Sequence, residues 1–352
     1  MKNLKPRKLY NTKNMSRREW LMARQSGLGG SDVASIAGLN QYSSAWQVFI
    51  DKTEPINEVS EETISEPAEW GNRNEPTIRA KFRENHPEWK VQQSHIMWQS
   101  AEYPFMLANV DGLVFDPKRG WGILEIKNTS EWLSDNWGEE QAPEHYIIQL
   151  QHYLKVLNLK WGIFAVLIGG NRYKEFYVER DEELIEALVE IEKDFWENHV
   201  LANVAPDPDG SKSAGDILDG LFPSSTALPE DEILELEDAT ILLINELDEL
   251  KVQEKEIKNR KAEIENLLKK KMGEHQVGMV EERKVTWKPS RSFSEKELEK
   301  AKPDLYKQFA ITTLDKAKFK KAYPKVYEAY MIPSEKRSLT VKEDGFLYAV
   351  SS

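Results

Sequence analysis

Three charged side chains stand at fixed spacing within one short stretch of the sequence. Residues 111–127 read Asp-Gly-Leu-Val-Phe-Asp-Pro-Lys-Arg-Gly-Trp-Gly-Ile-Leu-Glu-Ile-Lys, two apolar, strand-like runs around a cluster of turn formers. A hairpin whose turn centres on Lys118 sets Asp111 opposite Glu125, with Cβ atoms about 4.5–5.5 Å apart, where like charges repel. Lys127 follows Glu125 by two residues and therefore points to the same face. Two carboxylates and an ammonium at one end of a hairpin favour a divalent-metal site with a cation beside it.

These residues suit magnesium chemistry. Mg²⁺ takes oxygen ligands and is often held by one or two carboxylates. Apolar neighbours such as Ile123 and Ile126 predict partial burial of the acids, where an unpaired charge is costly. Lys127 can orient a water molecule or stabilise a developing oxyanion, as phosphodiester hydrolysis requires. The alternative is ordinary surface charge on a hairpin, because short Asp…Glu-x-Lys patterns are common.

Two further stretches offer polar side chains to such a site. Glu75 follows Trp70-Gly71 on a predicted helix and is either a third carboxylate at the metals or a solvated helix residue. Tyr146, Gln149 and Tyr153 are spaced three and four apart, so they share one helix face. Gln149 can reach the nucleophilic water or the scissile phosphate, whereas core packing is the simpler interpretation of the two tyrosines.

A glycine loop near the N-terminus is a candidate anion site. Arg24 and Ser31 bracket the loop at 27–30, and Ser31 is the predicted N-cap of a short apolar helix. Backbone N–H groups at a helix N-terminus bind phosphate readily, although glycine-rich caps are also common without a ligand. The six histidines show no paired ligand spacing, so we predict structural or exposed roles for His145 and His152 and no zinc site.

Composition bounds the class of protein. The chain has 352 residues, of which 40% are hydrophobic and eleven are Trp, enough to build a core. The absence of Cys excludes thiolate metal sites, disulfides and a cysteine nucleophile, and favours the cytoplasm. The first twenty residues are polar and basic, unlike a signal peptide. The longest apolar run, 161–168, is well short of the roughly 20 residues of a membrane span.

Charge is unevenly distributed along the chain. The formal net charge is −12, yet residues 1–24 carry eight Lys and Arg against Glu19 alone. Residues 283–342 carry sixteen basic residues against seven acidic ones, a surplus of nine. Basic ends on an acidic body can still neutralise phosphates locally, so the net charge does not exclude a nucleic-acid partner.

The elements that would position these side chains form an α/β pattern. The order strand–strand–strand–helix–strand–strand–helix over residues 91–199 implies a mixed sheet flanked by helices. We predict strands at 91–97, 105–115, 122–127, 161–168 and 173–180, and helices at 17–24, 31–37, 68–85, 144–158 and 181–199. We divide the chain into a domain at 1–205, a linker or exposed loop at 206–230 and a C-terminal region at 231–352.

The C-terminal region begins with a long predicted helix, from Asp231 to Met272, that Gly273 closes. Its apolar residues recur every seven positions, which is typical of a coiled coil, but Thr240, Glu254 and Lys261 interrupt the second apolar seam. The helix either pairs in a coiled coil or packs one stripe on its own domain. A small basic α/β region follows it. The repeating residues are Leu236, Leu243, Leu250, Ile257 and Ile264.

In this order the motifs resemble those of the YqaJ-type viral recombinases, relatives of phage lambda exonuclease within the PD-(D/E)xK nuclease superfamily. The resemblance covers about residues 17–200 and depends on five separated motifs; a looser similarity extends to Lys284–Lys288 and Pro303–Tyr306. The five motifs are Arg24…Gly29-Gly30-Ser31, Trp70-Gly71…Glu75, Asp111-Gly112, Glu125-Ile126-Lys127 and Gln149-Leu150-Gln151-His152-Tyr153.

The resemblance implies a role for each matching residue. Asp111, Glu125 and the backbone carbonyl of Ile126 would bind metal, Glu75 would be an additional acid, and Lys127 would activate or position the attacking water. Gln149 and Tyr146 would line the site. Arg24 and Ser31 would hold the 5′-terminal phosphate. Asn109 stands where the family has a small polar residue that contacts DNA. We expect two Mg²⁺ ions roughly 3.5–4 Å apart, with Mn²⁺ as a substitute.

The expected function is therefore Mg²⁺-dependent 5′→3′ digestion of one strand of linear duplex DNA from its end, in phage-type homologous recombination. The family implies a RecT-type single-strand-annealing partner and a trimer. Two alternatives stay open: an endonuclease or single-strand nuclease of the same superfamily, and a non-catalytic DNA-binding or assembly protein that uses residues 231–342.

Overall fold

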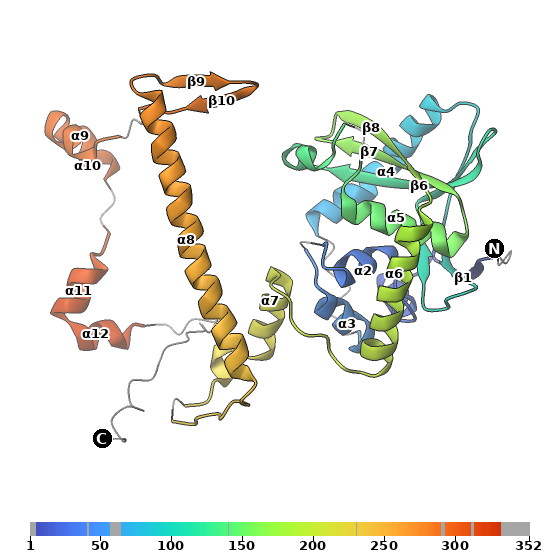
Figure 1. The fold of residues 1–352 in the computed structure, drawn as a ribbon, viewed down its shortest axis with the longest axis horizontal. Coiled ribbons are helices and arrows are strands. Elements are labelled where there is room, and N and C mark those ends of the chain that lie inside the picture. Colours follow the sequence, from blue (N-terminus) through green and yellow to red (C-terminus); the bar gives the residue numbers. More distant parts are fainter. Residues whose placement is uncertain are drawn as a thin grey trace. The chain divides into compact units, whose positions relative to one another are not determined.

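The structure, a computed structural model, forms two compact units, Met1–Leu221 and Phe222–Ser352 (Figure 1). The first contains every residue that the sequence places at the candidate site. The residues described are 5–40, 42–56, 65–139, 141–229, 231–289, 293–310 and 313–331.

A five-stranded mixed sheet forms the centre of the first unit. Its strand order is β2-β5-β6-β7-β8; β6 and β7 run parallel and the other neighbours antiparallel. β7 is buried on both faces, as its continuous apolar sequence predicts. The strands are β2 (Lys90–Gln93), β5 (Gly112–Asp116), β6 (Gly120–Thr129), β7 (Trp161–Ile168) and β8 (Arg172–Glu179).

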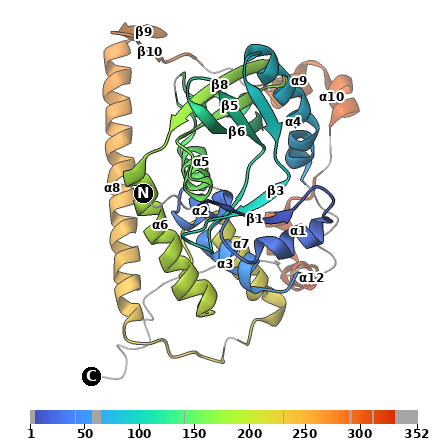
Figure 2. The same cartoon turned by 90° about the vertical axis from the view of Figure 1, so that its right-hand side faces the viewer.

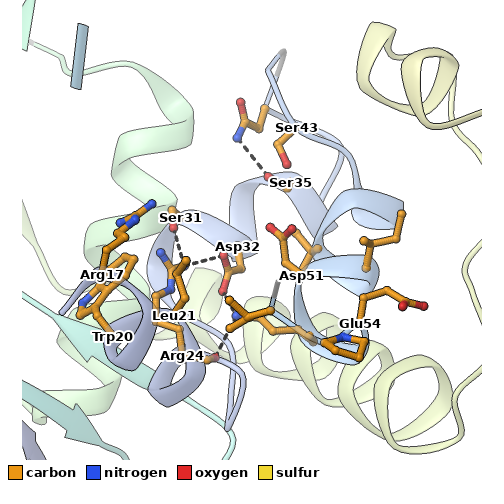
Figure 3. Close-up of a pocket in the computed structure, with 16 residues that line it drawn as sticks. Arg17, Trp20, Leu21, Arg24, Ser31, Asp32, Ser35, Ser43, Asp51 and Glu54 are labelled. Atoms are coloured by element: carbon orange, nitrogen blue, oxygen red, sulfur yellow. Dashed lines mark hydrogen bonds and ion pairs between the residues drawn. The ribbon is translucent and has the colours of Figure 1, made fainter. Parts of the chain in front are cut away.

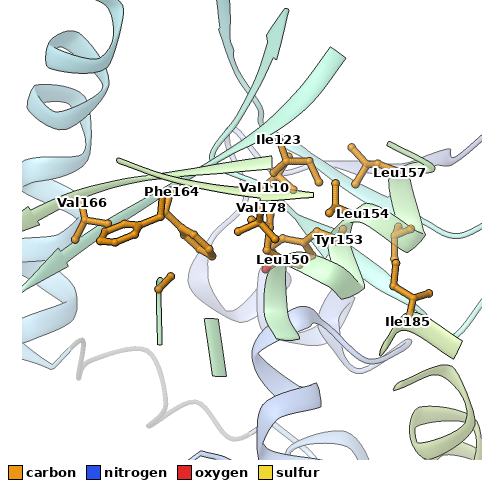
Figure 4. Packing of buried hydrophobic residues seen from close by; sticks show 14 of the residues in the cluster. Val110, Ile123, Leu150, Tyr153, Leu154, Leu157, Phe164, Val166, Val178 and Ile185 are labelled. Atoms are coloured by element: carbon orange, nitrogen blue, oxygen red, sulfur yellow. The ribbon is translucent and has the colours of Figure 1, made fainter. Parts of the chain in front are cut away.

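Helices cover both faces of this sheet, which confirms the predicted α/β class (Figure 2). α4 (Glu66–Asn85) packs Ile78 and Phe82 on one face of β6 and β7. The other face carries α5 (Glu144–Leu157) and α6 (Glu182–Phe195), which continues as a π-helix at Trp196–Leu201. Figure 4 shows this second core, with Leu150 and Leu154 of α5 packed toward the strands.

A smaller sheet adjoins the first where two predicted strands divide. We predicted single strands at 91–97 and 105–115, and this is wrong: each splits between two sheets. β3 (Ile96–Gln99) and β4 (Leu107–Asn109) join β1 (Arg7–Asn11) in a three-stranded antiparallel sheet, while β2 and β5 stay in the large one. The physical reason is that both segments pass from the large sheet to the small one at the same point. There the Ser94 N–H donates to the Asp111 carbonyl at 3.2 Å.

The hairpin of β5 and β6 has the predicted register. Gly112 pairs with Leu124 and Asp116 with Gly120, so the turn centres on Lys118. Gly120 has φ +78°, a left-handed conformation that glycine adopts without strain. Continued by one residue, this register sets Asp111 opposite Glu125.

Helices near the N-terminus complete the unit: α1 (Arg17–Arg24), α2 (Gly30–Ile36) and α3 (Ala45–Thr53). The N-cap of α2 is Gly29, not Ser31 as predicted, because the Asp32 carboxylate accepts the Gly29 N–H at 2.8 Å and so caps the helix two residues earlier.

Part of the predicted linker is helical. α7 (Lys212–Leu221) lies within the predicted loop at 206–230, and its Ala214 is fully buried. Ser213 Oγ lies 3.4 Å from Ser44 Oγ at the start of α3, so this helix belongs to the first unit. A 3₁₀ turn at Ser224–Thr226 follows it.

The second unit consists of a long helix and small elements. α8 (Thr240–Met272) ends at Gly273 as predicted but begins nine residues later than Asp231. Five acids lie between 231 and 238, and like charges three or four residues apart destabilise a helix. The stripe residues from Leu243 to Ile264 are 44–69% exposed. The other elements are β9 (Val277–Val280), β10 (Arg283–Thr286), α9 (Glu295–Ala301), α10 (Pro303–Phe309), α11 (Lys316–Ala322) and α12 (Pro324–Ala329).

Among the helices of the described ranges, none has the length and apolar character to cross a bilayer.

Candidate functional site

Asp111 lies at the point where the two sheets part. It is the second of two residues between β4 and β5, and its Oδ2 accepts the backbone N–H of Ile126 on β6 at 2.7 Å. The side chain of Asp111 thus accepts a hydrogen bond from β6 just beyond the last backbone pair of β5 and β6. This bond fixes the carboxylate beside Glu125.

A hydrogen-bonded network joins the end of β6 to α5. Lys127 Nζ donates to Glu125 Oε1 at 3.0 Å and to Gln149 Oε1 at 3.1 Å. Gln149 Nε2 in turn donates to Glu125 Oε1 and to the Tyr153 hydroxyl, both at 3.1 Å. The amide of Gln149 therefore faces an ammonium with its oxygen and a carboxylate with its nitrogen, which fixes its orientation.

Burial and mutual repulsion perturb both acids. Burial raises the pKa of Asp111 well above its usual value, and the neighbouring Glu125 raises it further. Burial likewise raises the pKa of Glu125, against the lowering effect of Lys127. Burial acts to lower the pKa of Lys127, but Glu125 and Asp111 outweigh it and the pKa is raised. Their raised pKa values favour the protonated, neutral form of both acids, while the lysine stays charged. A further cation beside the acids would favour their charged form, so this pattern is expected where such a cation binds.

Glu75 belongs to the same cluster, on α4. It lies close enough to raise the pKa of both Asp111 and Glu125. Its carboxylate is paired with the guanidinium of Arg79 one turn later, a buried side chain that also donates to the Asp111 carbonyl at 3.3 Å. Arg79 thus ties the third carboxylate to the strand end that carries Asp111.

The residues present fit a magnesium site. Glu125 Oε2 is buried and, within the described part of the chain, has no hydrogen-bond partner. A buried carboxylate oxygen left unpaired is costly unless a ligand engages it. No three His, Asp or Glu side chains of the described residues form a complete metal cage. Mg²⁺ does not need one, because it keeps several waters and commonly takes one or two carboxylates plus substrate phosphate oxygens.

Two more predicted residues lie around this cluster. The Tyr146 ring is 4.6 Å from Lys127 Nζ and stacks on Trp137, so it walls the ammonium on one side. Asn109 ends β4, half-buried and paired with Met97. Across the residues that the structure describes, no side-chain hydrogen bond joins Asn109 to the cluster.

Arg24 and Ser31 form a second cluster at a cavity of about 630 Å³ (Figure 3). Arg24 Nη2 donates to Ser31 Oγ at 3.0 Å and to Asp32 Oδ1 at 2.7 Å. Asp32 also pairs with Lys52 of α3 at 2.7 Å. Burial acts to raise the pKa of Asp32, but Arg24 and Lys52 outweigh it and hold the pKa far below its usual range.

Gly30 connects the two clusters. A Cβ at this position would lie 2.6 Å from Tyr153 Cε1 and 2.9 Å from Gln149 Cγ, both closer than real Cβ atoms approach. Glycine is therefore required for α2 to lie directly on the α5 residues that hold Lys127. The helix that carries Ser31 and the helix that carries Gln149 are therefore in contact.

The sequence-based prediction missed three charged residues: Arg79, Asp32 and Lys52. Arg79 follows Glu75 by four residues, the spacing of a helical ion pair, and this signal could have identified it. Asp32 follows Gly29 by three, the spacing of a capping box. Lys52 carried no local signal, since its partner lies on another helix.

Known proteins are similar to this chain in sequence. Residues 19–160 match the family model of the YqaJ-like viral recombinase domain. The uncharacterised protein YqaJ of Bacillus subtilis (strain 168) is 35% identical over 304 residues, which span 85% of this chain and 92% of that protein. The chain belongs to the YqaJ-like viral recombinase family. Every candidate site residue falls inside the range matched to the YqaJ-like domain.

Solved structures give weaker matches. An alkaline exonuclease from Laribacter hongkongensis aligns with 53% of this chain and 93% of its own, at 21% identity and a TM-score of 0.43. A phage-related exonuclease from Haemophilus somnus 129PT aligns with 50% of this chain and 96% of its own, at 12% identity and a TM-score of 0.31.

Proposed function

We propose that this chain is a metal-dependent nuclease that digests one strand of linear duplex DNA from its 5′ end during phage-type recombination. The observation that carries the proposal is the cluster of Asp111, Glu125, Lys127 and Gln149, in which one buried carboxylate oxygen has no described partner. Its occurrence in a YqaJ-like viral recombinase supports the same reaction.

Each residue of the cluster has a distinct task. Asp111, Glu125 and the Ile126 carbonyl would hold Mg²⁺, with Glu75 as an additional acid; two ions, replaceable by Mn²⁺, accord with the carboxylates available. When bound, such ions supply the Lewis acidity that phosphodiester hydrolysis needs. Lys127 would orient the attacking water through its ammonium, and Gln149 holds Lys127 by accepting a hydrogen bond from it.

The second cluster accounts for the choice of DNA end. Arg24 and Ser31 would bind the 5′-terminal phosphate, since a guanidinium and a hydroxyl point into one cavity. Asp32 holds Arg24 in place there. Tyr146, beside Lys127, and Asn109, at the end of β4, would line the path of the DNA.

Further partners are part of the proposal. A RecT-type single-strand-annealing protein would coat the strand that digestion exposes, and residues 231–342 would dock it or extend the DNA track. Assembly of several copies into a trimer, in the cytoplasm, would keep the enzyme on one DNA molecule. Deletion of residues 231–342 tests this role: unchanged partner pull-down together with unchanged DNA affinity at low salt would contradict it.

End-labelled linear duplex tests the activity, with and without Mg²⁺. We expect digestion only with the metal, and release of label from the 5′ end first. Lys127→Ala and Asp111→Ala should each lower the rate at least about 100-fold, since even indirect supports of a metal ligand cost about 10–100-fold when removed. Circular dichroism of both variants checks that the fold is retained.

Covalently closed circular duplex separates this activity from the endonuclease alternative. An end-dependent enzyme leaves the circle intact, whereas an endonuclease cuts it. Undiminished digestion by folded Lys127→Ala protein would overturn the assignment of the cluster, and a binding module would digest neither substrate.

A further inference from the structure

A groove opens beside the cluster, at the carboxyl end of β6. It has a volume of about 550 Å³ and lies between the first turns of α4, the last residues of β6 and the turn from β7 to β8. Most of its exposed lining is apolar and surrounds one indole, with amide, hydroxyl and carboxylate groups beside it. The side chains used here are those of Trp70, Asn74, Asn128, Thr129 and Ser130.

The groove begins next to the proposed catalytic residues. Asn74 immediately precedes Glu75, and Asn128 immediately follows Lys127. The two asparagines meet across the floor, where Asn74 Nδ2 donates to Asn128 Oδ1 at 3.3 Å. Consecutive Cα atoms are about 3.8 Å apart, and successive side chains of a strand point to opposite faces. Asn128 therefore lies on the α4 side of β6 and Lys127 on the α5 side, and the groove adjoins the cluster around the end of this strand.

Trp70 supplies the only aromatic surface of the groove lining described by the structure. Its side chain is 53% exposed, on a helix whose later turns bury Ile78 and Phe82. Arg73, paired with Glu69 at 2.6 Å, lies 5.9 Å from the ring centroid. The indole is thus held on a rigid element with much of its surface open, a form that suits stacking by a nucleobase.

We propose that this groove binds one unpaired nucleobase of the DNA strand, stacked on Trp70, beside the scissile phosphate. The amide and hydroxyl groups of Asn74, Asn128 and Ser130 offer donors and acceptors to the edge of a base. A single aromatic face with a polar rim fits one flat heterocycle better than the apolar side chains of a peptide. The inference deepens the proposed nuclease function and depends on it.

A second exposed indole follows the groove in the sequence. Trp132 lies two residues after Ser130, on the 3₁₀ turn Glu131–Asn136, and is 95% exposed. It offers a second stacking surface on the segment that leaves the groove.

Binding of duplex DNA that carries 2-aminopurine at its terminal positions tests the inference, with the full chain and with EDTA to prevent cleavage. Stacking on an indole quenches 2-aminopurine fluorescence. Trp70→Ala should weaken binding roughly five- to hundredfold, the usual range for loss of one stacked base, and abolish the quench. Trp70→Phe should retain part of both, which separates stacking from a change in fold.

Trp121→Ala is the matched control. It removes another exposed indole, 40% accessible, from the opposite end of the same strand β6. It should bind and quench like the native chain. Equal quenching and affinity in Trp70→Ala and native protein, or no quench in native protein, would overturn the inference. If the groove inference fails while Lys127→Ala is inactive, the proposed nuclease function stands. Digestion by Lys127→Ala would instead contradict the proposed nuclease function.

Discussion

One amide group, that of Gln149, forms hydrogen bonds with both charged side chains at the end of β6. Its oxygen accepts from Lys127 and its nitrogen donates to Glu125 and Tyr153. If the amide were flipped, its NH₂ group would face the Lys127 ammonium, and two donors would oppose each other. The direction of this one side chain therefore determines where the ammonium of Lys127 points.

Gln149→Glu isolates this effect, because it keeps the size of the side chain and removes the donor. A carboxylate would then face Glu125, and two like charges in a buried site repel. We expect activity to fall about 10–100-fold, as for other supports of a metal ligand, with the half-saturating Mg²⁺ concentration also changed. Steady-state kinetics over a Mg²⁺ series measures both. A variant with native activity at every concentration would contradict the role of Gln149; Gln151→Glu, on the same helix, is the control.

At the residue scale, spacing alone predicted the pair of acids and the lysine. The four-residue spacing of Glu75 and Arg79 indicates an ion pair, but it does not show that the pair belongs to the site, because many such pairs on helices are solvated. The difference is burial: Arg79 is 4% exposed, and the sequence holds no direct measure of that.

At the scale of elements, the contact between α2 and α5 requires Gly30. Gly30→Ala should push Tyr153 and Gln149 away from Lys127, because the added Cβ has no space. Overpacking of this kind typically costs about 1–3 kcal/mol. We expect unfolding at lower urea concentration and reduced activity. Gly71→Ala, where a Cβ meets open space on α4, is the matched control and should keep native activity and unfold at the same or a higher urea concentration, because Ala favours a helix interior over Gly. An equal loss in both variants would contradict the contact.

A buried ion pair joins α5 to α6. His152 Nδ1 lies 2.9 Å from Glu192 Oε1 and Nε2 lies 2.8 Å from the Leu107 carbonyl, so both ring nitrogens face acceptors. His152 is buried, one of the two outcomes predicted for it. Burial acts to lower its pKa, but Glu192 outweighs this and raises the pKa above 6.5. Burial raises the pKa of Glu192.

Both shifts give the same dependence of stability on pH. A raised histidine pKa contributes stability that is present below pH 6.5 and lost as pH rises through the folded-state pKa. The raised pKa of Glu192 adds a further loss of stability as the pH rises above 4.5. The melting temperature should therefore fall from pH 6 toward alkaline pH. Calorimetry of His152→Asn/Glu192→Gln should give a shallower fall; an unchanged slope would contradict the pair. His152→Ala alone should cost about 3–5 kcal/mol, since it leaves a buried carboxylate unpaired.

The elements were predictable where a local pattern determines them. The period of two gave the hairpin register, and one long apolar run gave β7. The division of two strands between sheets depends on partners far along the chain, which no local pattern encodes. α7 did carry a signal, since Ala214, Ile217, Leu218 and Leu221 follow helical spacing. The surrounding Gly, Pro and Asp residues concealed it.

At the scale of the whole molecule, the exposed stripe of α8 bears on assembly. The heptad spacing predicts pairing with a second helix, and the stripe residues remain largely exposed. Ile257→Asp should lower the mass measured by light scattering and leave the helix content intact, because Ile257 is 69% exposed. Val252→Asp changes an exposed residue off the stripe, 58% accessible, and should have no effect. A native chain that is already monomeric, or equal masses for all three, would contradict the coiled coil.

The hairpin of β5 and β6 also provides a place to attach a reporter. Lys118, at its tip, is exposed and lies seven residues from each acid (118 − 111 and 125 − 118). At about 3.3 Å a residue, the tip is roughly 23 Å from the cluster. A chain without native cysteines permits selective labelling of Lys118→Cys with a dye. Single molecules could then be followed along DNA in a microscope, with the dye rigidly connected to the proposed active site and too distant to disturb it.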